Sequence, residues 1–112
     1  YTDCLARAKG VSKWVAFIDP DEFLLPIQNQ SLPEFLIAYE KYGGVAANWL
    51  MFGTSNLKKI PENQLLIEAL THCSEKLFGG NRYVKSIVRP ERASHFENAH
   101  QPIYIGDYYG VN

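Results

Sequence analysis

Long apolar runs, an excess of charge of one sign and paired cysteine motifs are all missing from this sequence. Its longest apolar runs, residues 14–18 and 49–52, fall far short of the roughly 20 residues that a membrane-spanning helix needs. Eleven basic and twelve acidic side chains give a net charge of −1, without the basic excess that is typical of a nucleic-acid-binding surface. We therefore expect no membrane-spanning helix within these residues and no nucleic-acid partner.

The sequence has only two cysteines, Cys4 and Cys73, which are far apart and outside any metal-ligand spacing. We expect two reduced thiols that are mostly packed inside the protein, in keeping with the usual burial of free cysteine. A disulfide stays open if the protein is secreted, because two cysteines do not establish a compartment.

The sequence does have the composition of one globular domain. Hydrophobic residues make up 46% and charged residues 21% of the 112 residues, which excludes a disordered or low-complexity chain. The length suits a single hydrophobic core. The sequence opens with Tyr1 and shows no signal peptide, so we expect a piece of a longer protein.

The apolar spacing predicts strands that alternate with helices, and thus an α/β domain with mixed or parallel strand pairing. Ser31 and Glu34 have the spacing of a capping box at a helix start, and Gly10 suits the end of a helix. Beyond Pro90 the pattern is irregular. The expected strands are residues 13–19 and 45–52, both buried, and residues 83–88. The expected helices are residues 2–9, 31–42 and 64–73.

Three carboxylates, Asp19, Asp21 and Glu22, follow the first predicted strand within four residues. On an extended backbone Asp19 and Asp21 point to the same side and Glu22 points to the opposite side. Like charges this close repel each other, and a hard divalent cation with open positions for substrate phosphates would remove the conflict. The alternative is a solvated acidic turn, since Asp and Pro are common in turns.

Four segments, in order, resemble GT-A glycosyltransferases, above all the family-2-like bacterial transferases and glycosyltransferase family 92. Residues 14–23 resemble the metal-binding W-x-x-x-x-D-x-D-E-F segment, and residues 44–55 resemble a strand and loop that end in W-x-x-F-G-[ST]-S. Residues 85–90 resemble the K-S-I-V-[KR]-P strand, and residues 93–100 resemble the His-containing segment that follows it.

The resemblance implies the GT-A (nucleotide-diphospho-sugar transferase) fold, here as a partial α/β domain with a mixed sheet flanked by helices. Residues 1–112 would be the central and C-terminal part of one catalytic domain that is truncated at both ends. The compartment stays open: the cytoplasmic membrane face in a bacterium, or the Golgi lumen in a eukaryote. Missing regions could associate peripherally with a membrane.

The resemblance also implies the activity. A metal-dependent, hexosyltransferase-type enzyme would move a sugar from a nucleotide-sugar donor to a glycan or lipid-linked acceptor, with inversion at the anomeric carbon. The cofactor would be Mn²⁺ or Mg²⁺. The chain in isolation would be inactive, because the base-binding half of the domain is missing.

Site residues are carried over from the family's motifs. Asp19 and Asp21 would bind the metal and the donor, with Asp21 as a direct ligand and Asp19 at the ribose or at the metal through water. Of the two later histidines, His100 fits a further metal ligand better than His95. Glu68 is the candidate base that an inverting transferase needs, although a glutamate on a helix is most often a solvated residue.

Other assignments stay open. Glu22 would support the metal site or have a structural role, and Trp49 and Phe52 would form an acceptor platform or pack in the core. The alternative functions are a non-catalytic module or relic that binds sugar nucleotides, and a haloacid-dehalogenase-type phosphatase. The phosphatase also has a strand ending in D-x-D, and Asp107 loosely resembles its later acidic motif.

Overall fold

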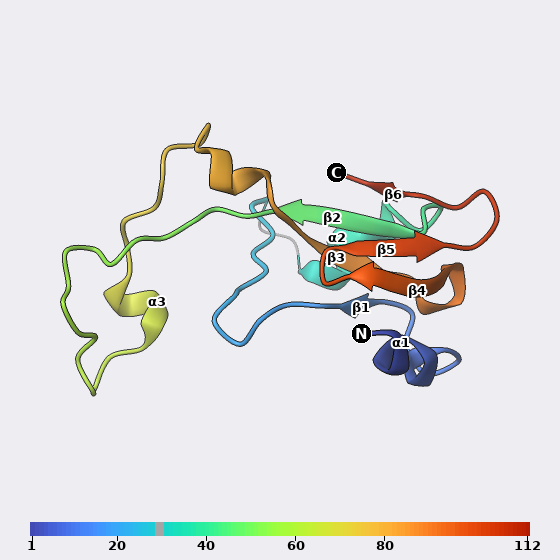
Figure 1. The fold of residues 1–112 in the computed structure, drawn as a ribbon, viewed down its shortest axis with the longest axis horizontal. Coiled ribbons are helices and arrows are strands. Elements are labelled where there is room, and N and C mark those ends of the chain that lie inside the picture. The colour runs from blue at the N-terminus through green and yellow to red at the C-terminus, as the bar shows by residue number, and fades with distance from the viewer. Residues whose placement is uncertain (29–30) are drawn as a thin grey trace. The chain divides into compact units, whose positions relative to one another are not determined.

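The computed structural model describes residues 1–28 and 31–112, which form two compact units (Figure 1). The sheet unit comprises Tyr1–Ala47 and Val84–Asn112, and the loop unit comprises Asn48–Tyr83. Of the helices described, none combines the length and the apolar character that crossing a bilayer requires. The elements in chain order are α1 (Thr2–Ala8), β1 (Val15–Ala16), α2 (Leu32–Ile37), β2 (Gly44–Asn48), α3 (Leu66–Ala69), the 3-10 helix η1 (Gly79–Arg82), β3 (Val84–Val88), the 3-10 helix η2 (Pro90–Arg92), β4 (Ala93–Asn98), β5 (Gln101–Tyr104) and β6 (Gly110–Val111).

Four strands form one mixed sheet in the order β1-β3-β2-β6. β1 runs antiparallel to β3, with Val15 opposite Val88, and β2 runs parallel to β6, with Gly44 opposite Gly110. β4 and β5 form a separate antiparallel pair. The predicted α/β class with a mixed sheet is therefore confirmed.

Both faces of β3 are covered by apolar side chains. Ile87 is buried against Leu36 of α2, whereas the next residue, Val88, is buried against Leu5 of α1. Successive residues of a strand point to opposite faces, so α2 covers one face of β3 and α1 covers the other. The remaining buried members of these two clusters are Val45, Phe17, Ala93 and Phe96.

The helix ends follow the local chemistry that the sequence predicts. The Glu34 N–H donates to Ser31 Oγ at 3.4 Å, and the Ser31 N–H donates to Glu34 Oε2 at 3.0 Å, which completes the capping box of α2. Gly10 follows α1 with a φ of 72°, a left-handed conformation that glycine adopts without a steric penalty. These two predictions are confirmed, although α2 ends at Ile37, earlier than expected.

The first predicted strand is wrong in its extent and its burial. β1 spans only Val15–Ala16 and lies at the edge of the mixed sheet. Phe17 is buried, but Ile18 is 42% exposed, because it points to the opposite face from Phe17, and Ala16 on that face is exposed as well. The apolar run thus belongs to an edge strand and not to a strand buried on both faces.

Three further expectations are corrected. The segment after Pro90, expected to be irregular, forms the β4–β5 pair. The helix predicted over residues 64–73 contracts to α3, because residues after Ala69 enter extended pairing, in which Cys73 bridges Phe52. Both Cys4 and Cys73 are exposed free thiols, where packed ones were expected.

Candidate functional site

The acidic residues after β1 form a β-turn, where an extended segment was predicted. The Glu22 N–H donates to the Asp19 carbonyl oxygen at 3.1 Å, and Pro20 occupies the second turn position, for which its fixed φ is suited. The Glu22 carboxylate also accepts a hydrogen bond from the Asp19 N–H at 2.8 Å. Glu22 therefore folds back onto Asp19 and does not point away from it. We call residues 19–22 the acidic turn.

Lys85 of β3 lies against the acidic turn. The antiparallel pairing of β1 with β3 continues to Phe17, whose N–H donates to the Ser86 carbonyl at 3.1 Å, so the next residues bring Lys85 beside Asp19. Lys85 Nζ donates to Asp19 Oδ2 at 2.7 Å and lies 3.4 Å from Glu22 Oε2. The Lys85 side chain is 6% exposed, and a charge this buried requires such partners.

The same contacts determine the charge state of Lys85. Burial lowers its pKa, but the hydrogen bond to Asp19 and the charges of Glu22 and Asp19 outweigh burial, so that the pKa is raised above its ordinary value. Lys85 is therefore an ammonium at neutral pH. One ammonium against three carboxylates gives the acidic turn and Lys85 together a formal charge of −2.

Asp21 differs from its two acidic neighbours. It stands at the corner of the turn with its side chain exposed, and no hydrogen bond or ion pair engages it within the described part of the chain. Asp19 is half exposed and Glu22 mostly buried, and both contact Lys85. The turn thus presents one carboxylate, that of Asp21, with all of its acceptor positions available.

His100 and His95 both lie in the β4–β5 pair or its connection. His100 Nδ1 donates to the Val84 carbonyl oxygen at 2.9 Å, and the His100 N–H donates to Asn98 Oδ1 at 2.9 Å. The first bond fixes the ring beside the start of β3, and the second fixes the backbone of His100. His95 is exposed on β4, with its Nδ1 2.9 Å from Ser94 Oγ.

The predicted ligands are not gathered into one cage. Among residues 1–28 and 31–112, no group of three or more His, Cys, Asp or Glu side chains could hold a metal ion, so Asp19, Asp21 and His100 do not form a three-ligand site. Mg²⁺ needs no such cage, because it is usually held by one or two carboxylates together with substrate phosphates. The exposed Asp21 carboxylate fits that chemistry, and the metal roles of Asp19 and His100 stay predictions.

Asn81, which the sequence analysis did not select, joins the segments of the loop unit. Its side chain is buried, its Oδ1 accepts from the Met51 N–H at 3.0 Å and from Ser74 Oγ at 3.1 Å, and its Nδ2 donates to the Glu75 carbonyl at 3.0 Å. The Asn81 carbonyl accepts from Asn48 Nδ2 at 3.1 Å. One side chain thereby connects three separate stretches of backbone.

The W-x-x-F-G-[ST]-S segment pairs with the residues after α3. Ser55, with a φ of 53°, accepts hydrogen bonds at its Oγ from the Thr71 N–H at 2.8 Å and the His72 N–H at 2.9 Å. The Gly53 N–H donates to the His72 carbonyl at 3.0 Å. The final serine of the motif therefore has a structural partner, which the sequence alone did not reveal.

Glu68 lies exposed on α3, and its Oε2 accepts from the Leu65 N–H at 2.9 Å. This bond satisfies a free donor at the start of the helix, so Glu68 has at least a capping role. Trp49 packs against Tyr83 with ring centroids 5.5 Å apart. Phe52 is 51% exposed.

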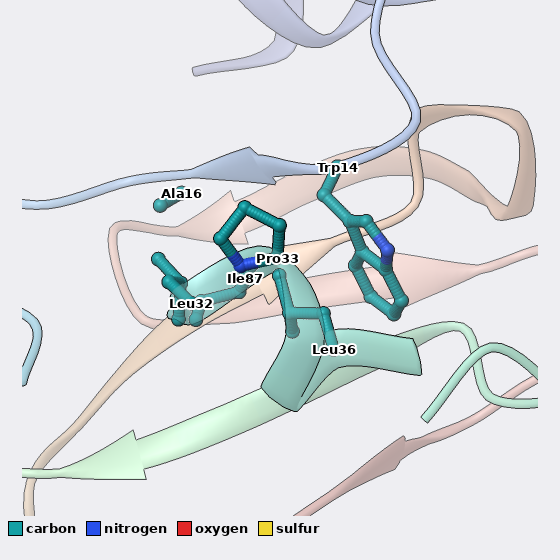
Figure 2. Close-up of a pocket in the computed structure, with 6 residues that line it drawn as sticks. All are labelled: Trp14, Ala16, Leu32, Pro33, Leu36 and Ile87. Atoms are coloured by element: carbon teal, nitrogen blue, oxygen red, sulfur yellow. The ribbon is translucent and has the colours of Figure 1, made fainter. Parts of the chain in front are cut away.

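Described residues line a hollow in each unit. In the sheet unit a cavity of about 240 Å³ lies beneath α2, and Figure 2 shows that its lining is aliphatic or aromatic. Its six lining residues are Trp14, Ala16, Leu32, Pro33, Leu36 and Ile87. In the loop unit a hollow of about 350 Å³ also offers polar groups. It is lined by Met51, Phe52, Gly53, His72, Cys73, Ser74 and Phe78.

Comparison with known proteins identifies the family to which this mixed sheet and its acidic turn belong. The family model for glycosyltransferase family 92 matches residues 1–110, and the chain belongs to that family. The resemblance found in the sequence is thereby confirmed.

Two relatives carry the same family description. A glycosyltransferase family 92 protein of Oryza sativa subsp. japonica is 35% identical over 94 residues, which are 81% of this chain and 15% of the relative. A glycosyltransferase family 92 protein of Caenorhabditis elegans is 27% identical over 92 residues, which are 81% of this chain and 18% of the relative. The chain therefore spans less than a fifth of either relative. No solved structure matches the chain, so the GT-A fold stays a prediction.

Proposed function

We infer that residues 1–112 belong to the catalytic domain of a glycosyltransferase that moves a sugar from a nucleotide-sugar donor to a glycan or lipid-linked acceptor. Family membership over residues 1–110 carries this inference. Because the chain spans 15% and 18% of its two relatives, the activity is assigned to the whole protein, of which these residues would be a part. The chain alone is expected to be inactive.

The acidic turn supports a donor site. Asp21 is the carboxylate that we assign to Mn²⁺ or Mg²⁺, with His100 as the candidate further ligand. When bound, the metal would stabilise the negative charge on the departing nucleoside diphosphate. Asp19, held in place by Lys85, would orient the donor ribose or a water molecule.

The loop unit supports an acceptor site. In an inverting displacement the acceptor oxygen attacks the anomeric carbon, the bond from that carbon to the diphosphate oxygen breaks, and a carboxylate takes the acceptor proton. Glu68 is the residue that we assign to this proton transfer. Phe52, which is half exposed and lines the hollow of the loop unit, would contact the apolar face of a sugar ring.

The donor site is tested by calorimetry on the full-length protein with Mn²⁺ and a nucleoside diphosphate. Asp21→Asn should abolish the metal-dependent part of nucleotide binding, because the amide lacks the carboxylate charge, while the fold stays intact. Asp107→Asn is the matched control, since Asp107 is also an exposed aspartate of the sheet unit. Equal metal-dependent affinity in wild type and Asp21→Asn would contradict the assignment. Loss of phosphomonoester hydrolysis in Asp107→Asn would favour the phosphatase alternative.

The reaction is tested by NMR assignment of the product anomer and by a Glu68→Gln variant. Glutamine retains an oxygen that can accept from the Leu65 N–H, so the cap of α3 persists while the base is lost. Turnover should fall roughly 10²- to 10⁴-fold, the usual contribution of a general base, with donor binding unchanged. Glu62→Gln, also at an exposed glutamate of the loop unit, should retain turnover. A product that retains the donor configuration would refute inversion, and normal turnover in Glu68→Gln would place the base elsewhere.

A further inference from the structure

We propose that Lys85 is a positioning residue that withholds Asp19 from the metal, so that Asp21 is the carboxylate of the acidic turn that binds it. This proposal rests on the proposed function, because it concerns the metal of the same donor site. It adds a residue outside the D-x-D-E-F segment, and it gives a physical cause for the different roles that the resemblance implies for the two aspartates.

The contacts of Lys85 favour this division of roles. Its ammonium donates to Asp19 Oδ2 at 2.7 Å, a charge-assisted hydrogen bond, and lies 3.4 Å from Glu22 Oε2. A divalent cation on Asp19 would face this ammonium at close range. At Asp19 Oδ2 the cation would have to displace Lys85, whose side chain is 6% exposed and would then be a buried charge with a weakened partner set. At Asp19 Oδ1 the cation would still be repelled by the ammonium. Asp21 presents no such competition.

The turn itself does not depend on Lys85. The Glu22 N–H bond to the Asp19 carbonyl and the Asp19 N–H bond to Glu22 Oε2 both lie within residues 19–22, and Pro20 restricts the backbone between them. Removing the ammonium should therefore release the Asp19 carboxylate without unfolding the turn. Loss of Lys85 should therefore raise the affinity of the site for a bare metal ion.

The arrangement also suits a site that must accept an anionic donor. With Lys85 the acidic turn carries a formal charge of −2 instead of −3, which reduces its repulsion of a diphosphate. A metal held by one carboxylate keeps more positions open for phosphate oxygens than a metal held by two. Lys85 would thus weaken binding of the metal alone and favour joint binding of metal and diphosphate.

The test is a titration of the full-length protein with Mn²⁺ alone, followed by electron paramagnetic resonance of the free ion. Lys85→Met should raise Mn²⁺ affinity roughly 3- to 10-fold, the effect expected when one nearby unit charge is removed. Adding Asp19→Asn to Lys85→Met should cancel the gain, and Lys85→Arg should bind as wild type because the charge is retained.

Three further variants serve as controls. Asp19→Asn alone also removes one nearby unit charge, so it should lower Mn²⁺ affinity by no more than the same roughly 3- to 10-fold, whereas Asp21→Asn should abolish saturable Mn²⁺ binding because it removes the direct ligand. Lys13→Met removes another lysine paired with a carboxylate, that of Glu40, at the opposite end of β1 and should leave affinity unchanged.

Several results would overturn the proposal. Lys85→Met with unchanged affinity, or with a loss that Asp19→Asn does not modify, would show that Lys85 only supports the fold. Should Lys85→Met fail to fold, equal losses in Asp19→Asn and Asp21→Asn would still contradict the division of roles. Each of these results leaves the proposed function standing as long as Asp21→Asn loses Mn²⁺, whereas a wild-type protein without saturable Mn²⁺ binding would contradict the proposed metal dependence as well.

Discussion

Replacing Asn81 with alanine should open the loop unit locally. The substitution removes the hydrogen bonds that the Asn81 side chain makes with the Met51 N–H, Ser74 Oγ and the Glu75 carbonyl, each between 3.0 and 3.1 Å. At about 1 kcal/mol for each bond, the loop unit should lose about 3 kcal/mol, which raises its local opening equilibrium roughly 100-fold. The loss concentrates here because Asn81 is a buried polar residue that connects separate backbone stretches.

Hydrogen exchange of the full-length protein measures this effect directly. Exchange at the Met51 amide should accelerate by about that factor, while amides of β3 in the sheet unit should keep their protection. Asn63→Ala is the matched control, because Asn63 is exposed and no hydrogen bond to it is found in the described residues. If Asn81→Ala and Asn63→Ala exchange at the same rate at Met51, the assignment of Asn81 as the residue that joins the loop unit is refuted.

Two further predictions concern the sheet unit. Gly110→Ala should destabilise it by about 1–3 kcal/mol in thermal unfolding, because the new Cβ would lie 2.7 Å from Tyr104 Oη, and a Tyr104→Phe background should reduce that loss. Gly79→Ala, whose Cβ would meet no atom within 4 Å, should be close to neutral. Burial raises the pKa of Tyr104 from 10.0 to about 12, so folding favours its neutral form. This contribution to stability should be complete below pH 10 and be lost as the pH rises to about 12, and alkaline unfolding of Tyr104→Phe should lack that part of the decline.

The parts of the fold that depend on neighbouring residues could be predicted from the sequence. A capping box requires only Ser31 and Glu34 at the right spacing, and the left-handed residue after α1 requires only Gly10. The five-residue β3 was placed to within one residue, because its apolar run ends at a proline. In each case the signal lies within a few residues of the element.

The β4–β5 pair was missed because β4 does not show the alternation of a regular strand. Its two buried residues, Ala93 and Phe96, are three positions apart. The pairing shifts register between Ala93 and His95 and again between Phe96 and Asn98, and such irregularities change which residues face the core. Alternation of apolar and polar residues, the sequence signal of a strand, is therefore absent from this segment.

The helix predicted over residues 64–73 is too long for a different reason. Its apolar residues do have helical spacing, but hydrogen bonds to a distant residue end the helix early. The N–H groups of Thr71 and His72, which a longer helix would have bonded internally, donate instead to Ser55 Oγ. Ser55 lies 16 residues before Thr71, so no local pattern reports the competition. Tertiary hydrogen bonds thus determined where α3 ends.

In the candidate site, too, neighbouring residues could be predicted from the sequence and distant contacts could not. One feature of the sequence does point to the distant contact. The sequence places Asp19 and Asp21 after a strand, but their different surroundings depend on Lys85, which lies 66 residues after Asp19. Lys85 belongs to a strand whose following residues are all apolar or small and buried, and a lysine in such a strand must find a counter-charge or lose its own. Here the acidic turn that follows the adjacent strand supplies it, through Asp19 and Glu22. A lysine near the start of a buried strand and a carboxylate cluster after the end of another strand therefore predict that the two strands are neighbours. Because the start of one strand then lies beside the end of the other, the pairing is antiparallel, as it is between β1 and β3.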